Sequence, residues 1–173
     1  MNVSPQIPRR VLLIAGATAA LGIKRAAHAQ TVAPEKHLPP IDDLRALVAT
    51  VARFRAPLLI LFSTPGCPFC REVRRNYLAP RAAEQARNTA PEFLLHEVDI
   101  TSERPIIDLA GARITEAIFA ARFNVKVVPV VALFDQTLQT LGEPLVGLDR
   151  SGFYEGYLAS AIDTARKRLR QTS

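Results

Sequence analysis

The two cysteines of the chain have the spacing of a dithiol site. Cys67 and Cys70 stand three residues apart, directly after the apolar run 58–62. Pro68, between them, suits the first position of a helix, where its missing N–H is not needed. A strand that delivers C-x-x-C to the start of a helix is typical of a redox site, in which the two sulfurs open and close a small disulfide ring.

The start of a helix gives the two thiols different roles. Unpaired amides and the positive end of the helix dipole stabilise an anion there, so Cys67 is predicted to be the nucleophilic thiolate, with a lowered pKa. Cys70 lies one turn further into the helix and is predicted to be the more shielded, resolving thiol.

Two other uses of the pair stay open on the sequence alone. One is a structural disulfide, although so short a loop constrains the unfolded chain little. The other is a zinc site, which needs two more Cys or His ligands at similar spacing, and His28, His37 and His96 form no such pair. Our first interpretation is a redox disulfide, with no metal ion and no other cofactor.

The first 29 residues are predicted to be a signal peptide for export. Arg9 and Arg10 open a charged region, residues 11–23 form an apolar stretch too short to span a bilayer, and residues 27–29 (Ala-His-Ala) supply a small-x-small cleavage site. The paired arginines fit a twin-arginine signal and equally a general secretory signal. A retained N-terminal anchor is a third alternative.

The remaining chain is predicted to form a polar linker, residues 30–40, and one domain, residues 41–170. Four of the 22 basic residues lie in the signal peptide, which leaves 18 against 16 acidic residues. Because no basic run interleaved with aromatic residues appears, we predict no nucleic-acid partner. We expect a periplasmic protein, in a compartment where dithiol chemistry is meaningful. In the absence of a recognisable dimerisation module in the sequence, we also expect a monomer.

The order of the predicted elements is that of an α/β domain. Apolar spacing predicts helices over 44–54, 68–78, 80–87, 115–123 and 151–170, and strands over 58–62, 93–99, 127–134 and 140–146. Strands separated by helices favour a parallel arrangement, and the late pair adds an antiparallel hairpin, so we predict a mixed central sheet flanked by helices. Residues 101–113 are predicted to be irregular. Ser151 is expected to cap the last helix, whose buried face is predicted to consist of Phe153, Tyr157, Leu158, Ala161 and Ile162.

Pro129 is the second informative residue. A proline inside the apolar run 127–134 cannot donate to a sheet ladder, so it is expected at the start of a strand. Whether its peptide bond is cis or trans stays open on these grounds.

Together these pieces resemble the thioredoxin superfamily. The resemblance rests on the strand that ends at Ser63, the run Gly66-Cys67-Pro68-Phe69-Cys70, the strand 97–100, residues 123–125 before Val128 and Pro129, and Gly147 before the last helix. It covers roughly residues 41–169. Within the superfamily the chain is most similar to exported thioredoxin-like proteins of the SoxW type and to the C-terminal domain of the DsbD thiol reductases, which carry an insertion matching residues 101–114.

The resemblance implies a thioredoxin-like α/β fold and thiol–disulfide exchange. It implies that Cys67 attacks a substrate disulfide and that Cys70 resolves the mixed disulfide. It also implies that Pro129 is cis and lies beside the Cys67 sulfur. Phe69, Val128 and Pro129 would form the substrate groove, where the backbone of Val128 pairs with an extended substrate.

Two departures from cytosolic thioredoxins bear on the direction of electron flow. Leu61 stands where that family has a buried aspartate, six residues before the first cysteine, that handles the proton of the second thiol. Glu97, on the neighbouring strand, is either its replacement or a surface or salt-bridged glutamate. Pro68 and Phe69 replace the Gly-Pro of thioredoxin, which changes the redox poise.

We therefore expect a periplasmic thiol–disulfide oxidoreductase that acts mainly as a reductase. It would take electrons from a membrane thiol transporter and pass them to exported proteins with cysteines or disulfides. A dithiol oxidase that donates its disulfide to exported proteins is one alternative. A non-catalytic binding module, with Cys67–Cys70 as a static disulfide, is the other.

Overall fold

The structure is a computed structural model that describes Met1 and residues 38–88, 90–149 and 151–171. The predicted signal peptide and most of the predicted linker therefore lie outside the described residues. The elements are α1 (Leu44–Phe54), β1 (Leu58–Ser63), α2 (Pro68–Val73), the π-helix η1 (Arg74–Leu78), α3 (Ala79–Gln85), β2 (Leu94–Asp99), β3 (Pro105–Ile107), β4 (Arg113–Thr115), α4 (Glu116–Ala121), β5 (Val130–Phe134), β6 (Leu145–Val146) and α5 (Tyr154–Gln171). Among the described helices, none combines the length and apolar character needed to cross a membrane.

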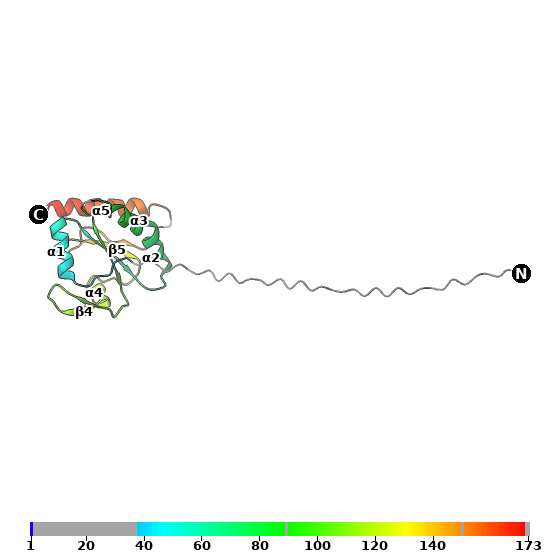
Figure 1. Cartoon of the computed structure of the whole chain (residues 1–173), viewed down its shortest axis with the longest axis horizontal. Coiled ribbons are helices and arrows are strands. Elements are labelled where there is room, and N and C mark those ends of the chain that lie inside the picture. The colour runs from blue at the N-terminus through cyan, green and yellow to red at the C-terminus, as the bar shows by residue number, and fades with distance from the viewer. Residues whose placement is uncertain (2–37, 89, 150, 172–173) are drawn as a thin grey trace. The chain divides into compact units, whose positions relative to one another are not determined.

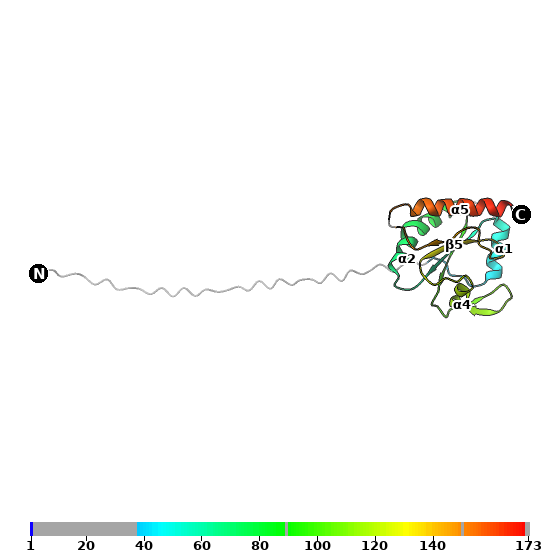
Figure 2. The same ribbon diagram turned by 180° about the vertical axis from the view of Figure 1, so that it is seen from behind.

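The central sheet has four strands in the order β2-β1-β5-β6. β1 runs parallel to β2 and antiparallel to β5, which in turn pairs antiparallel with β6, so the predicted mixed sheet is confirmed. Successive β1 side chains point to opposite faces. Leu59 and Leu61 pack toward α2 and α5, whereas Leu58, Ile60 and Phe62 pack toward α1 and α4. Figures 1 and 2 show these helices on the two sides of the sheet.

The first helix forms where its capping residue and apolar spacing predict it. The Asp43 carboxylate accepts a hydrogen bond from the Arg45 N–H at 2.8 Å. That amide lies in the first turn of the helix, where no backbone carbonyl is available to accept its hydrogen bond. The buried side chains recur at helical spacing and are Leu44, Leu47 and Val51. The helix ends at Phe54, as predicted, where Arg55 adopts the left-handed conformation with φ 50°.

Leu38, within the predicted linker, packs against the domain. Leu38 is buried, and its N–H donates to Glu97 Oε2 at 3.2 Å. The Glu97 N–H donates in turn to the Pro39 carbonyl at 2.9 Å. The end of the predicted linker is thereby paired with β2 along the open edge of the sheet.

The helix after Cys70 changes its hydrogen-bond pattern just before Pro80, where the sequence predicted a break or kink and a second helical piece. α2 continues into the π-helical turn Arg74–Leu78, and α3 follows at once with Pro80 in its first turn. A proline is tolerated there because the first N–H groups of a helix have no partner within it. The π turn changes the hydrogen-bond register, so the helix can pass the proline and continue.

The segment predicted to be irregular, residues 101–113, contains most of a short hairpin. β3 and β4 pair antiparallel, with Ile106 opposite Ile114. The Asp108 carboxylate accepts two backbone N–H groups of the turn, at 3.0 and 2.9 Å, and Gly111 supplies a φ of 82°. Three-residue strands are too short for an alternation pattern to reveal them.

The last helix buries Leu158 and Ile162, as predicted, but leaves Phe153 and Tyr157, also predicted to be buried, exposed. It begins at Tyr154, and the Asp149 carboxylate, not Ser151, accepts the Phe153 N–H at 2.7 Å. Phe153 and Tyr157 are 63% and 53% exposed. The buried residues follow the one face that stays apolar to the end of the helix. They are Tyr154, Leu158, Ile162, Ala165 and Leu169.

The late strands are shorter than predicted. β5 starts at Val130 instead of at 127, and β6 spans only Leu145–Val146. Near the predicted start of the second strand, the two segments are paired only by a single antiparallel bridge between Phe134 and Thr140.

His96 on β2 is half-buried rather than directed fully to water, and its Nδ1 lies 3.1 Å from the Pro40 carbonyl oxygen. Burial lowers its pKa below 6.5, against the raising effect of the Pro40 and Pro39 carbonyls. The unfolded chain therefore binds a proton more readily than the folded one as pH falls through about 6.5. We expect the free energy of unfolding to fall over that range, and to fall less in His96→Gln. Urea unfolding at about pH 7.5 and pH 5.5 checks this, and an equal decrease in both proteins would contradict it.

Candidate active site

The loop after β1 delivers Cys67 to the start of α2. Gly66 has φ 75°, a left-handed conformation that glycine adopts without strain. Cys67 itself is extended and caps the helix, its Sγ accepting the Cys70 N–H at 3.1 Å. Pro68 occupies the first turn, as predicted. The Cys67 sulfur thus already receives one of the amides that would stabilise a thiolate.

Cys67 and Cys70 form a disulfide, with their Cα atoms 5.3 Å apart. Cys70 is fully buried and Cys67 is partly exposed. The first sulfur is therefore the one that an incoming disulfide can reach, and the second is shielded one turn inside. In the described part of the chain, no cluster of three or more Cys, His, Asp or Glu side chains has the arrangement of a metal site.

Val128 and Pro129 form the second loop at the same edge of the sheet. Their peptide bond is cis, as the family resemblance implies. The register of β1 and β5 places Phe62 opposite Val130, so the end of β1 and the start of β5 lie side by side. The Gly147 N–H donates to the Pro129 carbonyl at 2.8 Å and ties this loop to β6. The cysteine loop and the proline loop consequently emerge together.

Apolar surface is exposed around the two loops. Phe69 is 46% exposed and Val127 is 58% exposed. An open hollow of about 480 Å³ adjoins Phe69, and its other lining residues are Glu72, Tyr77, Leu148, Asp149 and Gly152. Of the predicted groove residues, Val128 is half-buried and Pro129 buried. Apolar surface is therefore available to an extended peptide at the two loops, one of which carries the partly exposed Cys67.

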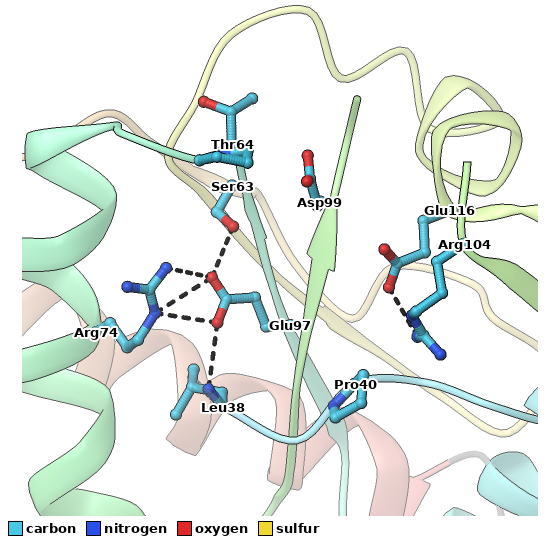
Figure 3. Close-up of a pocket in the computed structure, with 10 residues that line it drawn as sticks. Leu38, Pro40, Ser63, Thr64, Arg74, Glu97, Asp99, Arg104 and Glu116 are labelled. Atoms are coloured by element: carbon cyan, nitrogen blue, oxygen red, sulfur yellow. Dashed lines mark hydrogen bonds and ion pairs between the residues drawn. The ribbon is translucent and has the colours of Figure 1, made fainter. Parts of the chain in front are cut away.

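Glu97 is a buried, salt-bridged glutamate, one of the two interpretations that the sequence left open. Its β2 position pairs in register with Leu61, which is fully buried. Arg74 forms an ion pair with the Glu97 carboxylate, and Ser63 Oγ donates to Oε1 at 2.6 Å. Figure 3 shows Arg74, Ser63 and Leu38 converging on this one carboxylate. The cluster joins the end of β1, the helix after Cys70 and the start of the domain.

Arg74 was not singled out from the sequence. Its signal was present, because Arg74 lies four residues after Cys70 and its N–H bonds to the Cys70 carbonyl. Residues four apart on a helix share a face, so a buried Cys70 predicts a buried Arg74. On sequence grounds, scattered arginines such as Arg71, Arg74 and Arg75 are typical of solvated helix faces, with support of a thiolate as the alternative for those near Cys67, but Arg74 is buried.

A polar pocket of about 300 Å³ lies beneath the turn that leads to Cys67 (Figure 3). Besides the Glu97 cluster it is lined by Arg104 and Glu116, which form an ion pair at 2.8 Å. Asp99 also lines it, and its carboxylate accepts the Thr101 N–H at 2.9 Å. Each carboxylate that lines the pocket already has a partner, so the pocket supports the loop and offers no free acid or base.

Comparison with known proteins agrees with this geometry. A family model described as a thioredoxin-like domain matches residues 45–148. Among solved structures, the chain is similar to thioredoxin f from spinach chloroplast (16% identity, 76% of this chain and 98% of that one, TM-score 0.48). It is also similar to the thioredoxin of Trichomonas vaginalis (17% identity, 75% and 96%, TM-score 0.47). No curated protein sequence matches the chain.

Proposed function

Because the chain belongs to the family of thioredoxin-like domains and carries a C-x-x-C redox pair, we propose that it is a periplasmic thiol–disulfide oxidoreductase acting mainly as a reductase. The observation that carries this proposal is the disulfide between a partly exposed Cys67 and a fully buried Cys70 at the start of α2. An accessible nucleophile beside a shielded resolving thiol is what directional exchange with a client requires.

The reaction begins from the reduced dithiol. The Cys67 thiolate attacks one sulfur of a client disulfide, so a mixed disulfide forms and the other client sulfur leaves and takes up a proton. Cys70 then loses its proton and attacks the Cys67 sulfur. The Cys67–Cys70 disulfide closes and the client departs as a dithiol. Two electrons have passed from the enzyme to the client, and the two client sulfurs have taken up two protons, one released by Cys70 and one from solvent because Cys67 reacts as a thiolate.

A second dithiol must restore the reduced enzyme. We propose that a membrane thiol transporter supplies those two electrons, by the same exchange in the reverse sense. The clients would be exported proteins whose disulfides need reducing, held along Phe69, Val128 and Pro129. The SoxW-type or DsbD-type subfamily and the monomeric state belong to the same proposal, because they rest on the sequence resemblance.

The periplasmic location rests on residues 1–29, which lie outside the described residues. Its support is the charged start, the apolar stretch and the small-x-small site in the sequence. Expression of the full chain in a Gram-negative host, followed by fractionation and N-terminal sequencing, should give a periplasmic protein that starts at Gln30. A protein retained in the cytoplasm with Met1 in place would contradict the proposed export.

The reduction potential separates the reductase from the oxidase. A reductase should equilibrate near the thioredoxin value, roughly −270 mV, and an oxidase near roughly −120 mV. Equilibration of the protein in dithiothreitol redox buffers, read by thiol alkylation, measures it. A value at the oxidising end would overturn the reductase assignment and leave thiol–disulfide exchange intact.

A further inference from the structure

Arginine side chains from three elements line one open hollow of about 670 Å³. Arg55 follows α1, Arg87 follows α3, and Arg166 and Arg170 lie near the end of α5. We call this the arginine hollow. Its remaining lining residues are Phe54, Asn88, Ala90, Pro91 and Glu92. None of these residues takes part in the active site described above.

The arginine hollow carries more positive charge than its neighbours neutralise. Glu92 is the one carboxylate among the described lining residues, and it lies 3.6 Å from Arg166. Nothing in the described ranges forms an ion pair with Arg55, Arg87 or Arg170. Asp163, also on α5, is paired with Lys167 at 2.6 Å and interacts more weakly with Arg166 and Arg170, so the positive charge around the hollow still exceeds the negative charge. Like charges held this close repel each other, and an anionic partner would relieve that repulsion.

The arginine hollow lies at the opposite end of the domain from the disulfide. Arg55 precedes β1, whereas Cys67 follows it, so the strand separates them. α5 starts beside Phe69, since Gly152 and Phe69 line the same hollow, and it ends at the arginines. The helix rise puts about 24 Å between those two ends. Figures 1 and 2 show α2 at one end of the domain, and α1 with the end of α5 at the other.

The choice of partner follows from the aromatic ring at the rim. Phe54 is 38% exposed, and the Arg53 guanidinium lies 5.1 Å from its ring centre. Guanidinium groups bind phosphate oxygens in a bidentate manner. A free phosphate ion would use the arginines but gain nothing from the ring. A membrane surface offers anionic headgroups to the arginines and an apolar acyl boundary to the Phe54 ring.

We propose that the arginine hollow docks the domain on a membrane surface that carries anionic phospholipid headgroups. Phe54 would enter the headgroup boundary while the arginines contact the phosphates. The disulfide, at the far end, would face away from the lipid and stay open to clients. This inference does not depend on the reductase assignment, because it concerns a separate surface.

The chain contains no tryptophan, so a single introduced one reports its own surroundings. Phe54→Trp places the reporter at the arginine hollow, and Phe153→Trp places it on an exposed site at the disulfide end. Both are made in the full chain, so the N-terminal segment is the same in each. With phosphatidylglycerol vesicles containing brominated lipid, we expect the Phe54→Trp emission to shift to the blue and be quenched. The Phe153→Trp emission should stay unchanged.

Matched charge reversals test the arginines themselves in the Phe54→Trp protein. Arg87→Glu with Arg170→Glu should weaken vesicle binding by about 30-fold or more. Arg75→Glu with Arg113→Glu changes the net charge equally at exposed positions outside the hollow, and should weaken it far less. Near-UV and far-UV circular dichroism of each variant, recorded alongside, shows whether the fold is kept. If the first pair does not fold, the loss of quenching as salt concentration rises serves as the second measurement.

Three results would overturn the proposal. Phe54→Trp emission that vesicles leave unchanged would show that the hollow does not meet lipid. Equal quenching of Phe153→Trp, or equal weakening by both charge pairs, would show general attraction and no oriented docking. Full displacement by inorganic phosphate, beyond the effect of sodium chloride at the same ionic strength, would assign the hollow to a small anion instead.

Discussion

Cys70→Ala is expected to trap client proteins in mixed disulfides that Cys67→Ser cannot form. In the first variant the exposed Cys67 still attacks a client, but no buried thiol is present to release it. In the second, the remaining thiol is fully buried and cannot reach a client disulfide. Insulin reduction with dithiothreitol should fall by about 10³-fold or more in Cys67→Ser, because the nucleophile is lost.

The trapping experiment carries its own control. The double variant Cys67→Ser with Cys70→Ala should trap nothing, and non-reducing gels followed by identification of the linked protein give the readout. Trapping by Cys67→Ser as strong as by Cys70→Ala would reverse the assigned roles. If wild type and Cys67→Ser both fail to reduce insulin while both still capture a partner, the domain is a binding module with a static disulfide.

The sequence was sufficient for the parts of the fold that rest on strong local patterns. β1 is a continuous apolar run and occupies the centre of the sheet, where both faces are covered. A helix was predicted to begin at 115, and the Thr115 side chain caps it by accepting the Ile118 N–H at 3.2 Å. The C-x-x-C spacing predicted the unequal shielding of Cys67 and Cys70. In each case the deciding interaction lies within a few residues along the chain.

Predictions were wrong where distant contacts decide the outcome. Two adjacent faces of the last helix are apolar near its start, and the core selects the one that includes Tyr154 and leaves Phe153 exposed. The β3–β4 hairpin depends on Asp108, whose carboxylate organises the turn and also pairs with Arg122 at 3.0 Å. Neither the competing face nor that long-range ion pair is visible in apolar periodicity.

The support of the candidate site was harder to foresee than its cysteines. Arg74, Ser63 and Glu97 come from three elements, and they meet because β1 and β2 pair in one register beneath the helix. In the sequence these are three separate polar residues, and no local pattern links them. Only the register of the parallel pair, set by the buried residues of both strands, brings them onto one face.

Loss of the Glu97 carboxylate should therefore be among the most destabilising single changes in the domain. Glu97 is 8% exposed and Arg74 is 3% exposed. In Glu97→Ala, the guanidinium stays buried without its carboxylate, and the Ser63 hydroxyl and Leu38 N–H lose their acceptor. Removal of one partner from such a buried pair costs about 3–5 kcal/mol. Denaturant unfolding of the oxidised protein measures the loss.

The double variant Arg74→Met with Glu97→Leu should recover much of that loss. It removes both charges together and leaves no uncompensated ion in the core, and apolar replacements of buried pairs are often neutral or stabilising. Asp163→Ala, which breaks the exposed Asp163–Lys167 pair, is the matched control and should change stability little. If Glu97→Ala were no more destabilising than that control, or if the double variant were less stable than Glu97→Ala, the buried Arg74–Glu97 pair would not be what stabilises the contact between the helix after Cys70 and β2.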